Sequence, residues 1–118
     1  LLLASLAEAG QLALKVDAMD FCATIKDRAA IGVADTFPSD IYSIYCLTVV
    51  RGATDTTAVR HIWYYGSQKA GETRLPVRSS PWRTWSCKRM RPEGKGEWHV
   101  EVLAPDGGVI ASKKLFLK

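Results

Sequence analysis

The stretch EWHVEVLAPDGGVIASKKLFL, residues 97–117, decides the fold class of this 118-residue chain. Apolar and polar side chains alternate through residues 97–103, a period of two that is typical of a half-buried β-strand. Residues 105–108, PDGG, have the composition of a hairpin turn in which glycine supplies the positive φ. Residues 109–117 then return as a second strand. The stretch predicts an antiparallel β-hairpin and indicates an all-β domain.

The same period of two recurs along the rest of the chain, between turn signals that lie about eight to twelve residues apart. It predicts strands at residues 12–25, 41–50, 57–65, 73–78, 82–90, 97–103 and 109–117. About seven strands with no interior helix favour an antiparallel β-sandwich of the immunoglobulin-like type.

Three local features refine this arrangement. The apolar phase changes between Ala18 and Asp20, which indicates a β-bulge. Residues 41–50 are apolar on both faces, as expected of a central strand. Pro76 has no backbone N–H to donate, so its strand, residues 73–78, is expected at the edge of a sheet.

Positive charge is concentrated in one region of the chain. The net charge is only +4, but residues 74–95 carry seven cationic side chains against Glu93 alone. These are Arg74, Arg78, Arg83, Lys88, Arg89, Arg91 and Lys95. Such a cluster attracts phosphates, anionic lipid or an acidic partner. The alternative interpretation is that these are solvated faces of ordinary strands.

The first residues form an apolar segment, residues 1–11, ahead of a β-sandwich domain at residues 12–118. LLLASLAEAG, residues 1–10, resembles the end of a secretory signal, with small residues in an A-x-A arrangement. It is interpreted as a signal remnant, an anchor or a docking segment of an exported, envelope-associated protein. The expected partner-binding residues here are Leu1, Leu2, Leu3 and Leu6. The alternative is an ordinary amphipathic segment of a cytoplasmic domain.

The chain has three cysteines, Cys22, Cys46 and Cys87, and no C-x-x-C pair. A zinc site could take further ligands only from His61 and His99, and no metal site is expected. A disulfide between Cys22 and Cys46 is possible because their strands could be neighbours, which would leave Cys87 free. The alternative is that all three are reduced.

Residues 79–89, SSPWRTWSCKR, hold two tryptophans and several cations. Strand alternation places Trp82 and Lys88 on one face and Arg83, Trp85 and Arg89 on the other, so no contiguous aromatic platform is expected from this strand. One tryptophan is expected in the core and the other beside the arginines on an exposed face. We interpret these five residues as partner-binding, since Trp and Arg dominate interface energetics.

No catalytic constellation is evident. The chain contains no G-x-S-x-G elbow and no glycine-rich loop ahead of a helix, so neither catalytic residues nor a cofactor site is expected. His61 is expected to be a hydrogen-bonded, partly buried histidine. A nucleic-acid partner is not expected, because an exported protein seldom meets one.

Five segments resemble the bacterial family known as domain of unknown function 2914. They are FCATIKDRAAIG, IYCLT, HIWYY, PWRTWSCK and GEWHVEVLAPDGGVI. The resemblance implies an extracytoplasmic or membrane-attached β-domain without assigned catalytic residues. The expected function is a non-catalytic module that docks on a membrane protein or a multi-subunit envelope complex, with self-association possible. The alternative is a carbohydrate-binding module.

Overall fold

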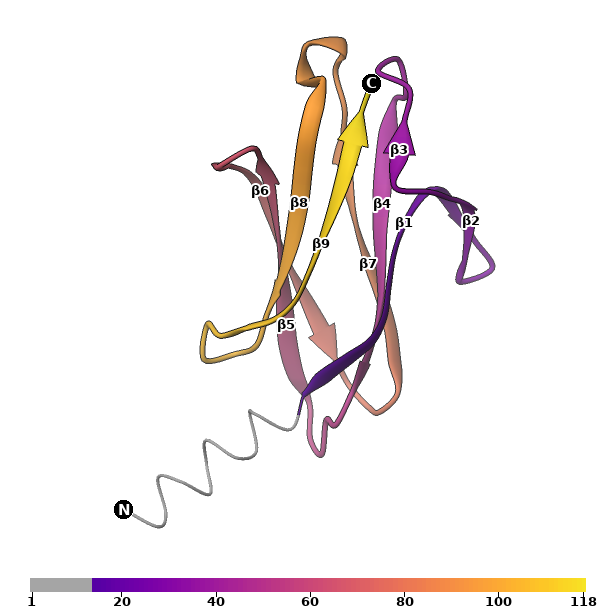
Figure 1. Cartoon of the computed structure of the whole chain (residues 1–118). Coiled ribbons are helices and arrows are strands. Elements are labelled where there is room, and N and C mark those ends of the chain that lie inside the picture. Colours follow the sequence, from indigo (N-terminus) through magenta and orange to yellow (C-terminus); the bar gives the residue numbers. More distant parts are fainter. Residues whose placement is uncertain (1–13) are drawn as a thin grey trace.

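Two β-sheets packed face to face form the structure, a computed structural model that describes residues 14–118 (Figure 1). The strands are β1 (Lys15–Lys26), β2 (Ala29–Val33), β3 (Thr36–Phe37), β4 (Ser43–Arg51), β5 (Thr57–Tyr65), β6 (Gln68–Val77), β7 (Trp82–Arg89), β8 (Gly96–Leu103) and β9 (Val109–Leu117), and η1 (Pro92–Gly94) is a short 3₁₀ turn. One sheet has the order β2-β1-β4-β7 and the other β3-β9-β8-β5-β6. This arrangement confirms the predicted β-sandwich.

Several predicted details are confirmed. The register of β1 against β4 shifts between Val16 and Ala18, next to the expected bulge. Strand β4 lies between β1 and β7, as its two apolar faces indicated, and β6 with Pro76 lies at an edge. The hairpin of β8 and β9 pairs antiparallel over its whole length.

The structure contains two short strands that the sequence pattern did not predict. Strand β2 follows β1 through a tight turn at Asp27 and Arg28, whose φ angles are 51° and 63°. Two consecutive positive φ angles define the hairpin turn that matches strand twist, and glycine or asparagine usually occupies it. Asp27 suits the first position of such a turn, but Arg28 stands where glycine is usual, so the polar residues 26–28 indicated the end of a strand and not a hairpin. Strand β3 is two residues long and pairs parallel with β9, the one parallel pair among the described strands.

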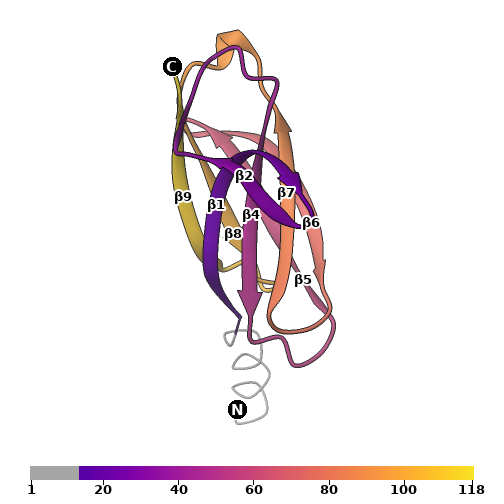
Figure 2. The same ribbon diagram turned by 90° about the vertical axis from the view of Figure 1, so that its right-hand side faces the viewer.

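The end of β1 and all of β2 form a hairpin, here called the arm (residues 23–33), that lies across the outer face of the four-stranded sheet. Figure 2 shows β2 crossing in front of β4 toward β7. At the tip of the arm, Arg83 of β7 donates to the carbonyl of Arg28 at 2.7 Å, and Arg28 donates to the carbonyl of Arg83 at 3.4 Å. Leu47 and Cys22 are buried although they are on this outer face. The four-stranded sheet therefore buries apolar side chains on both faces, against the other sheet on its inner face and beneath the arm on its outer face.

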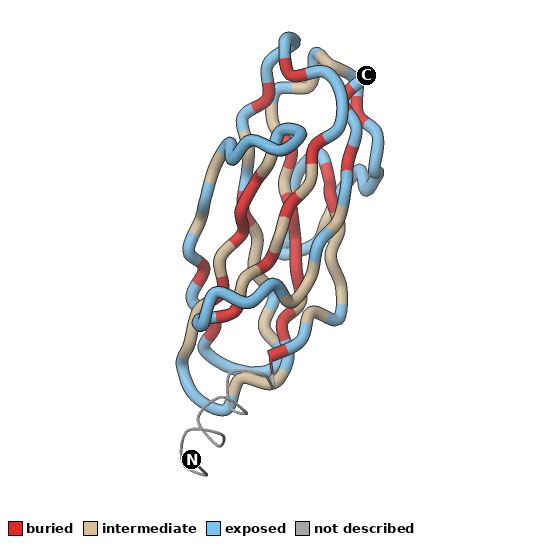
Figure 3. The backbone as a smooth tube through the Cα atoms, turned by 60° about the vertical axis from the view of Figure 1, so that its left-hand side comes forward, coloured by how far each residue is buried: buried red, intermediate tan, exposed pale blue. Residues whose placement is uncertain are grey.

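The core fills the space between the two sheets. Figure 3 shows that buried residues recur along the long strands. One cluster contains Phe21, Ile44, Trp63, Met90 and Leu115 among its members. A second, smaller cluster consists of Leu14, Val50, Val59, Leu75, Val77 and Val102. Burial of this apolar surface supplies most of the folding free energy.

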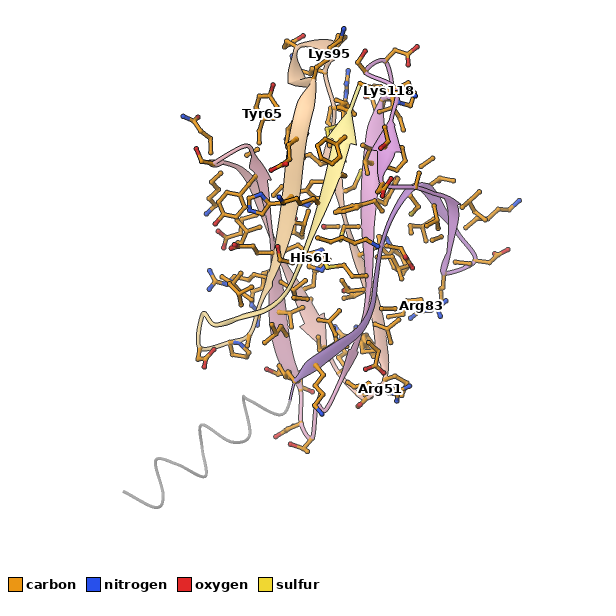
Figure 4. The ribbon with its side chains drawn as sticks, viewed as in Figure 1. Arg51, His61, Tyr65, Arg83, Lys95 and Lys118 are labelled. Carbon is orange, nitrogen blue, oxygen red and sulfur yellow. The ribbon has the colours of Figure 1, made fainter. Side chains whose placement is uncertain are left out.

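A polar group is built into this apolar interior. His61 on β5 has no exposed surface and lies between the sheets (Figure 4). Its Nδ1 is 2.7 Å from Ser86 Oγ on β7, and its Nε2 is 3.2 Å from Thr48 Oγ1 on β4. The predicted hydrogen-bonded histidine is confirmed, and its burial is complete rather than partial.

The donors and acceptors form one continuous chain. An indole N–H only donates, so Trp63 Nε1 donates to Ser86 Oγ at 3.0 Å, and the Ser86 hydroxyl donates in turn to His61 Nδ1. The Thr48 hydroxyl donates to the Thr84 carbonyl at 3.4 Å, which leaves Thr48 Oγ1 to accept the Nε2–H of His61. When the His61 imidazole is neutral, every donor in this chain of hydrogen bonds has an acceptor. Burial accordingly lowers the pKa of His61 from 6.5 to about 4.

Between pH 6.5 and pH 4, His61 takes up a proton in the unfolded chain but not in the folded chain. The free energy of unfolding should therefore decrease as the pH falls through this range. The loss attributable to His61 is about 3 kcal/mol, with no further contribution above or below that window. Urea denaturation at several pH values measures it. The matched variant His61→Gln removes this titration and retains all others, so its stability should depend less on pH in that range.

The NMR titration of the His61 ring provides a check that does not require the variant to fold. The imidazole should remain neutral at pH 5. A ring that becomes charged near pH 6.5, or equal pH dependence in both proteins, would contradict the hydrogen-bond chain.

Candidate binding site on strand β7

Strand β7 is the outermost described strand of its sheet and pairs only with β4. Met90 N donates to Tyr42 O at 2.8 Å, which identifies this pair as a hydrogen-bonded pair of the ladder. In an antiparallel ladder such pairs alternate with non-bonded ones. The peptide groups that point away from β4 are therefore those of Arg83, Trp85, Cys87 and Arg89, and they form the free edge of β7.

The side chains of β7 separate into two faces, as predicted. Trp82 packs against the smaller core cluster, and Ser86 is buried between the sheets. Trp85 is opposite Leu47 on the outer face, with the guanidinium of Arg28 at 5.8 Å from its ring centroid. Trp85 lies beside an arginine as predicted, whereas the expected core tryptophan, Trp82, is half-buried at the margin of the core.

The two tryptophans project from opposite faces of β7, yet both contribute to one surface. A shallow hollow of about 270 Å³, the first hollow, is lined by Arg28, Pro76, Arg78, Trp82, Arg83, Thr84 and Trp85. Because β7 is an edge strand, the hollow extends around its edge and meets side chains of both faces.

The first hollow is basic throughout. Three arginines line it, Arg28, Arg78 and Arg83, and no carboxylate from residues 14–118 does. Arg28 comes from the arm, and sequence reasoning missed it because its contact with β7 joins residues far apart in the chain. Figure 4 shows Arg83 on the side of the sheet that carries the arm.

A second hollow of about 210 Å³ lies at the other end of β7. It is lined by Tyr65, Lys88, Arg89, Arg91, Glu93, Gly94 and Trp98. Its walls are held by hydrogen bonds from Trp98 Nε1 to the Gly94 carbonyl at 2.7 Å and from the Tyr65 hydroxyl to the Lys95 carbonyl at 2.5 Å. Figure 4 shows Tyr65 and Lys95 at this end of the sandwich.

Arg89 is fixed beside this hollow. Its guanidinium is 3.7 Å from the centroid of the Tyr42 ring, and it donates to the Met90 carbonyl. Lys88 projects from the inner face, and its side chain passes close to Gly71 of β6. Of the five sequence-predicted residues of β7, the structure assigns Trp82, Arg83 and Trp85 to the first hollow and Lys88 and Arg89 to the second.

A third hollow, about 290 Å³, is lined by Thr56, Thr57, Ala58, Arg60, Arg74, Ala104 and Pro105. It contains no aromatic ring, and Arg60 already bonds Glu72 at 3.2 Å. We therefore give it less weight than the two hollows on β7.

The possible disulfide between Cys22 and Cys46 does not form, and the alternative of reduced cysteines describes the structure. Their strands are neighbours, but Cys46 is opposite Phe21 and Cys22 is opposite Tyr45. A shift of one residue turns the two side chains to opposite faces of the sheet. All three cysteines are free thiols, and burial raises the pKa of both Cys22 and Cys46.

The remaining predicted site residues, Leu1, Leu2, Leu3 and Leu6, lie outside the described residues. Within residues 14–118, the structure has no helix of the length and apolar character that a membrane span requires. No three His, Cys, Asp or Glu side chains gather in a metal-binding arrangement in that same part of the chain.

Thiol reactivity tests this arrangement of cysteines. Cys87 is exposed, so a thiol reagent should modify one cysteine per native chain and all three after unfolding without a reductant. The variant Cys87→Ser should show no rapid reaction in the native state. Only one reactive thiol in the unfolded protein would indicate a disulfide and contradict the register.

The family described as protein of unknown function (DUF2914) matches residues 56–115. No curated protein matches the chain significantly. The matched region contains β5 to β8, most of β9 and every residue of the two β7 hollows except Arg28. Because this region is more than half of the sequence, the chain belongs to the DUF2914 family.

Proposed function

We propose that this domain is a non-catalytic, exported interaction module that docks on a membrane protein or a larger envelope assembly. Its contact surface is the first hollow together with the free edge of β7. The observation that carries the proposal is that two tryptophans and three arginines line one hollow that has no carboxylate. Trp and Arg are the residue types most enriched at the energetic centres of protein interfaces.

The surface is also well ordered before any partner arrives. Trp82 and Trp85 are both half-buried, and Arg28 and Arg83 hold each other through their backbone carbonyls. Side chains that are already fixed lose little conformational entropy on binding. A partner with acidic groups therefore gains charge-assisted hydrogen bonds at low ordering cost.

A carbohydrate-binding module is the second candidate, supported by the two tryptophan rings at one hollow. Aromatic rings can stack on the apolar faces of sugars. However, guanidinium and indole groups only donate hydrogen bonds, whereas neutral sugar hydroxyls also need acceptors. Glycan-array binding that Trp82→Ala and Trp85→Ala both abolish would favour this candidate.

Photo-cross-linking in cells tests the interaction module. With p-benzoylphenylalanine in place of Arg83, we expect one defined adduct with a protein of the membrane fraction. The same residue in place of Ser112, exposed on β9 of the other sheet, serves as the matched control. No adduct from position 83, or identical adducts from both positions, would argue against this surface.

The exposed thiol of Cys87 provides a test of location. A membrane-impermeant maleimide added to intact spheroplasts should label Cys87 if the domain is exported, while Cys22 and Cys46 are protected by burial. The variant Cys87→Ser should remain unlabelled. Labelling that occurs only after lysis would contradict export.

A further inference from the structure

We propose that β7 receives an extended acidic peptide segment as an added strand, whose carboxylates bind the cations of both hollows. The inference rests on the proposed function and names the chemistry of the partner at that surface. It is carried by three properties of β7: a free backbone edge, a basic lining at both ends, and the distance between those ends.

The backbone edge is available for pairing. Among the described strands nothing pairs with β7 on the side away from β4. The Arg83 carbonyl already accepts a hydrogen bond from Arg28, which closes the edge at that end. The peptide groups of Trp85, Cys87 and Arg89 remain, with the alternate spacing that an added strand uses.

The charge of the two hollows defines the class of partner. Their combined lining contains six cations, Arg28, Arg78, Arg83, Lys88, Arg89 and Arg91, against Glu93 alone. Guanidinium and ammonium groups have no acceptor, whereas an ionised carboxylate has no donor. Asp and Glu side chains thus complement this lining, and guanidinium–carboxylate pairs can form two parallel hydrogen bonds.

The separation of the hollows favours an extended chain over a compact ligand. Arg83 and Arg89 are six residues apart on one strand, which corresponds to about 20 Å. A single small anion occupies one hollow only. A peptide in the extended conformation has the same rise per residue as β7, so its alternate side chains reach cations at both ends.

The same cations disfavour pairing of β7 with a second copy of itself. An open edge strand is a template for aggregation, and charged side chains are a common protection against it. Two copies of β7 placed edge to edge would bring like charges together. The same side chains favour a strand of opposite charge, so one set of residues repels a second copy and attracts an acidic segment.

The probe for this proposal is a fluorescein-labelled ten-residue peptide of alternating Glu and Thr. Fluorescence anisotropy should show saturable binding that weakens as salt increases. The double variant Arg83→Glu/Arg89→Glu should bind at least about tenfold more weakly. Lys15→Glu/Lys114→Glu, which makes the same charge change away from β7, should bind like the unchanged domain.

The mode of binding requires a separate measurement. Hydrogen exchange by NMR should show that the amides of Trp85, Cys87 and Arg89 become protected by the peptide. The same peptide with N-methyl groups on the alternate amides that would face β7 should lose about tenfold in affinity, because it cannot complete the ladder. Methylation of the other alternate amides should have little effect.

Three results would overturn the inference. They are no binding of the peptide, equal binding of both N-methylated peptides, and stronger binding of the anionic glycan polygalacturonate without amide protection. Each result is distinguishable from failure of the proposed function, because cross-linking at position 83 does not depend on the chemistry or conformation of the partner.

Discussion

The hydrogen-bond chain through His61 is the interaction on which the rest of this structure depends. It joins Trp63 and His61 of one sheet to Ser86 and Thr48 of the other across an otherwise apolar core. A buried polar group without its partner costs about 1–3 kcal/mol, so an alternative register that separates these groups is strongly disfavoured. Because Ser86 must face inward, strand alternation turns its two neighbours on β7 outward. The buried hydrogen bonds of Ser86 thereby determine which side chains β7 presents on its outer face.

The arm constrains β7 from the opposite side. Its tip carries Arg28 to the carbonyl of Arg83 and to the ring of Trp85. The outer-face residues Leu47 and Cys22 are as well buried as residues of the sandwich core. Strand β7 is thus held by the hydrogen-bond chain on its inner face and by the arm on its outer face. From Trp85 to Arg89, its free edge is the direction in which neither constraint acts.

The sequence was informative where a single strand carries its own signal. Alternation predicted the seven long strands, the two faces of β7 and the inward histidine, and the missing donor of Pro76 predicted an edge. Contacts between segments that are far apart in the sequence produce no such pattern. The turn at Asp27 lacks glycine and asparagine, so the arm was missed and Arg28 could not be associated with β7. The disulfide failed for a related reason, because alternation cannot determine which residues on two strands are opposite each other.

The way β7 is held also bears on how the surface can bind. Any ordering of a strand that takes place on binding reduces affinity. Here Ser86 is fixed in the core, Arg83 is hydrogen-bonded to the arm and Arg89 is stacked on Tyr42. The strand is therefore held at its centre and near both ends in the unbound domain. When a partner binds such an edge, it is mainly the partner that loses conformational entropy. The physical features that stabilise the sandwich are therefore the same ones that lower the cost of recognition at its edge, and a change that loosens the buried chain at Ser86 should weaken both together.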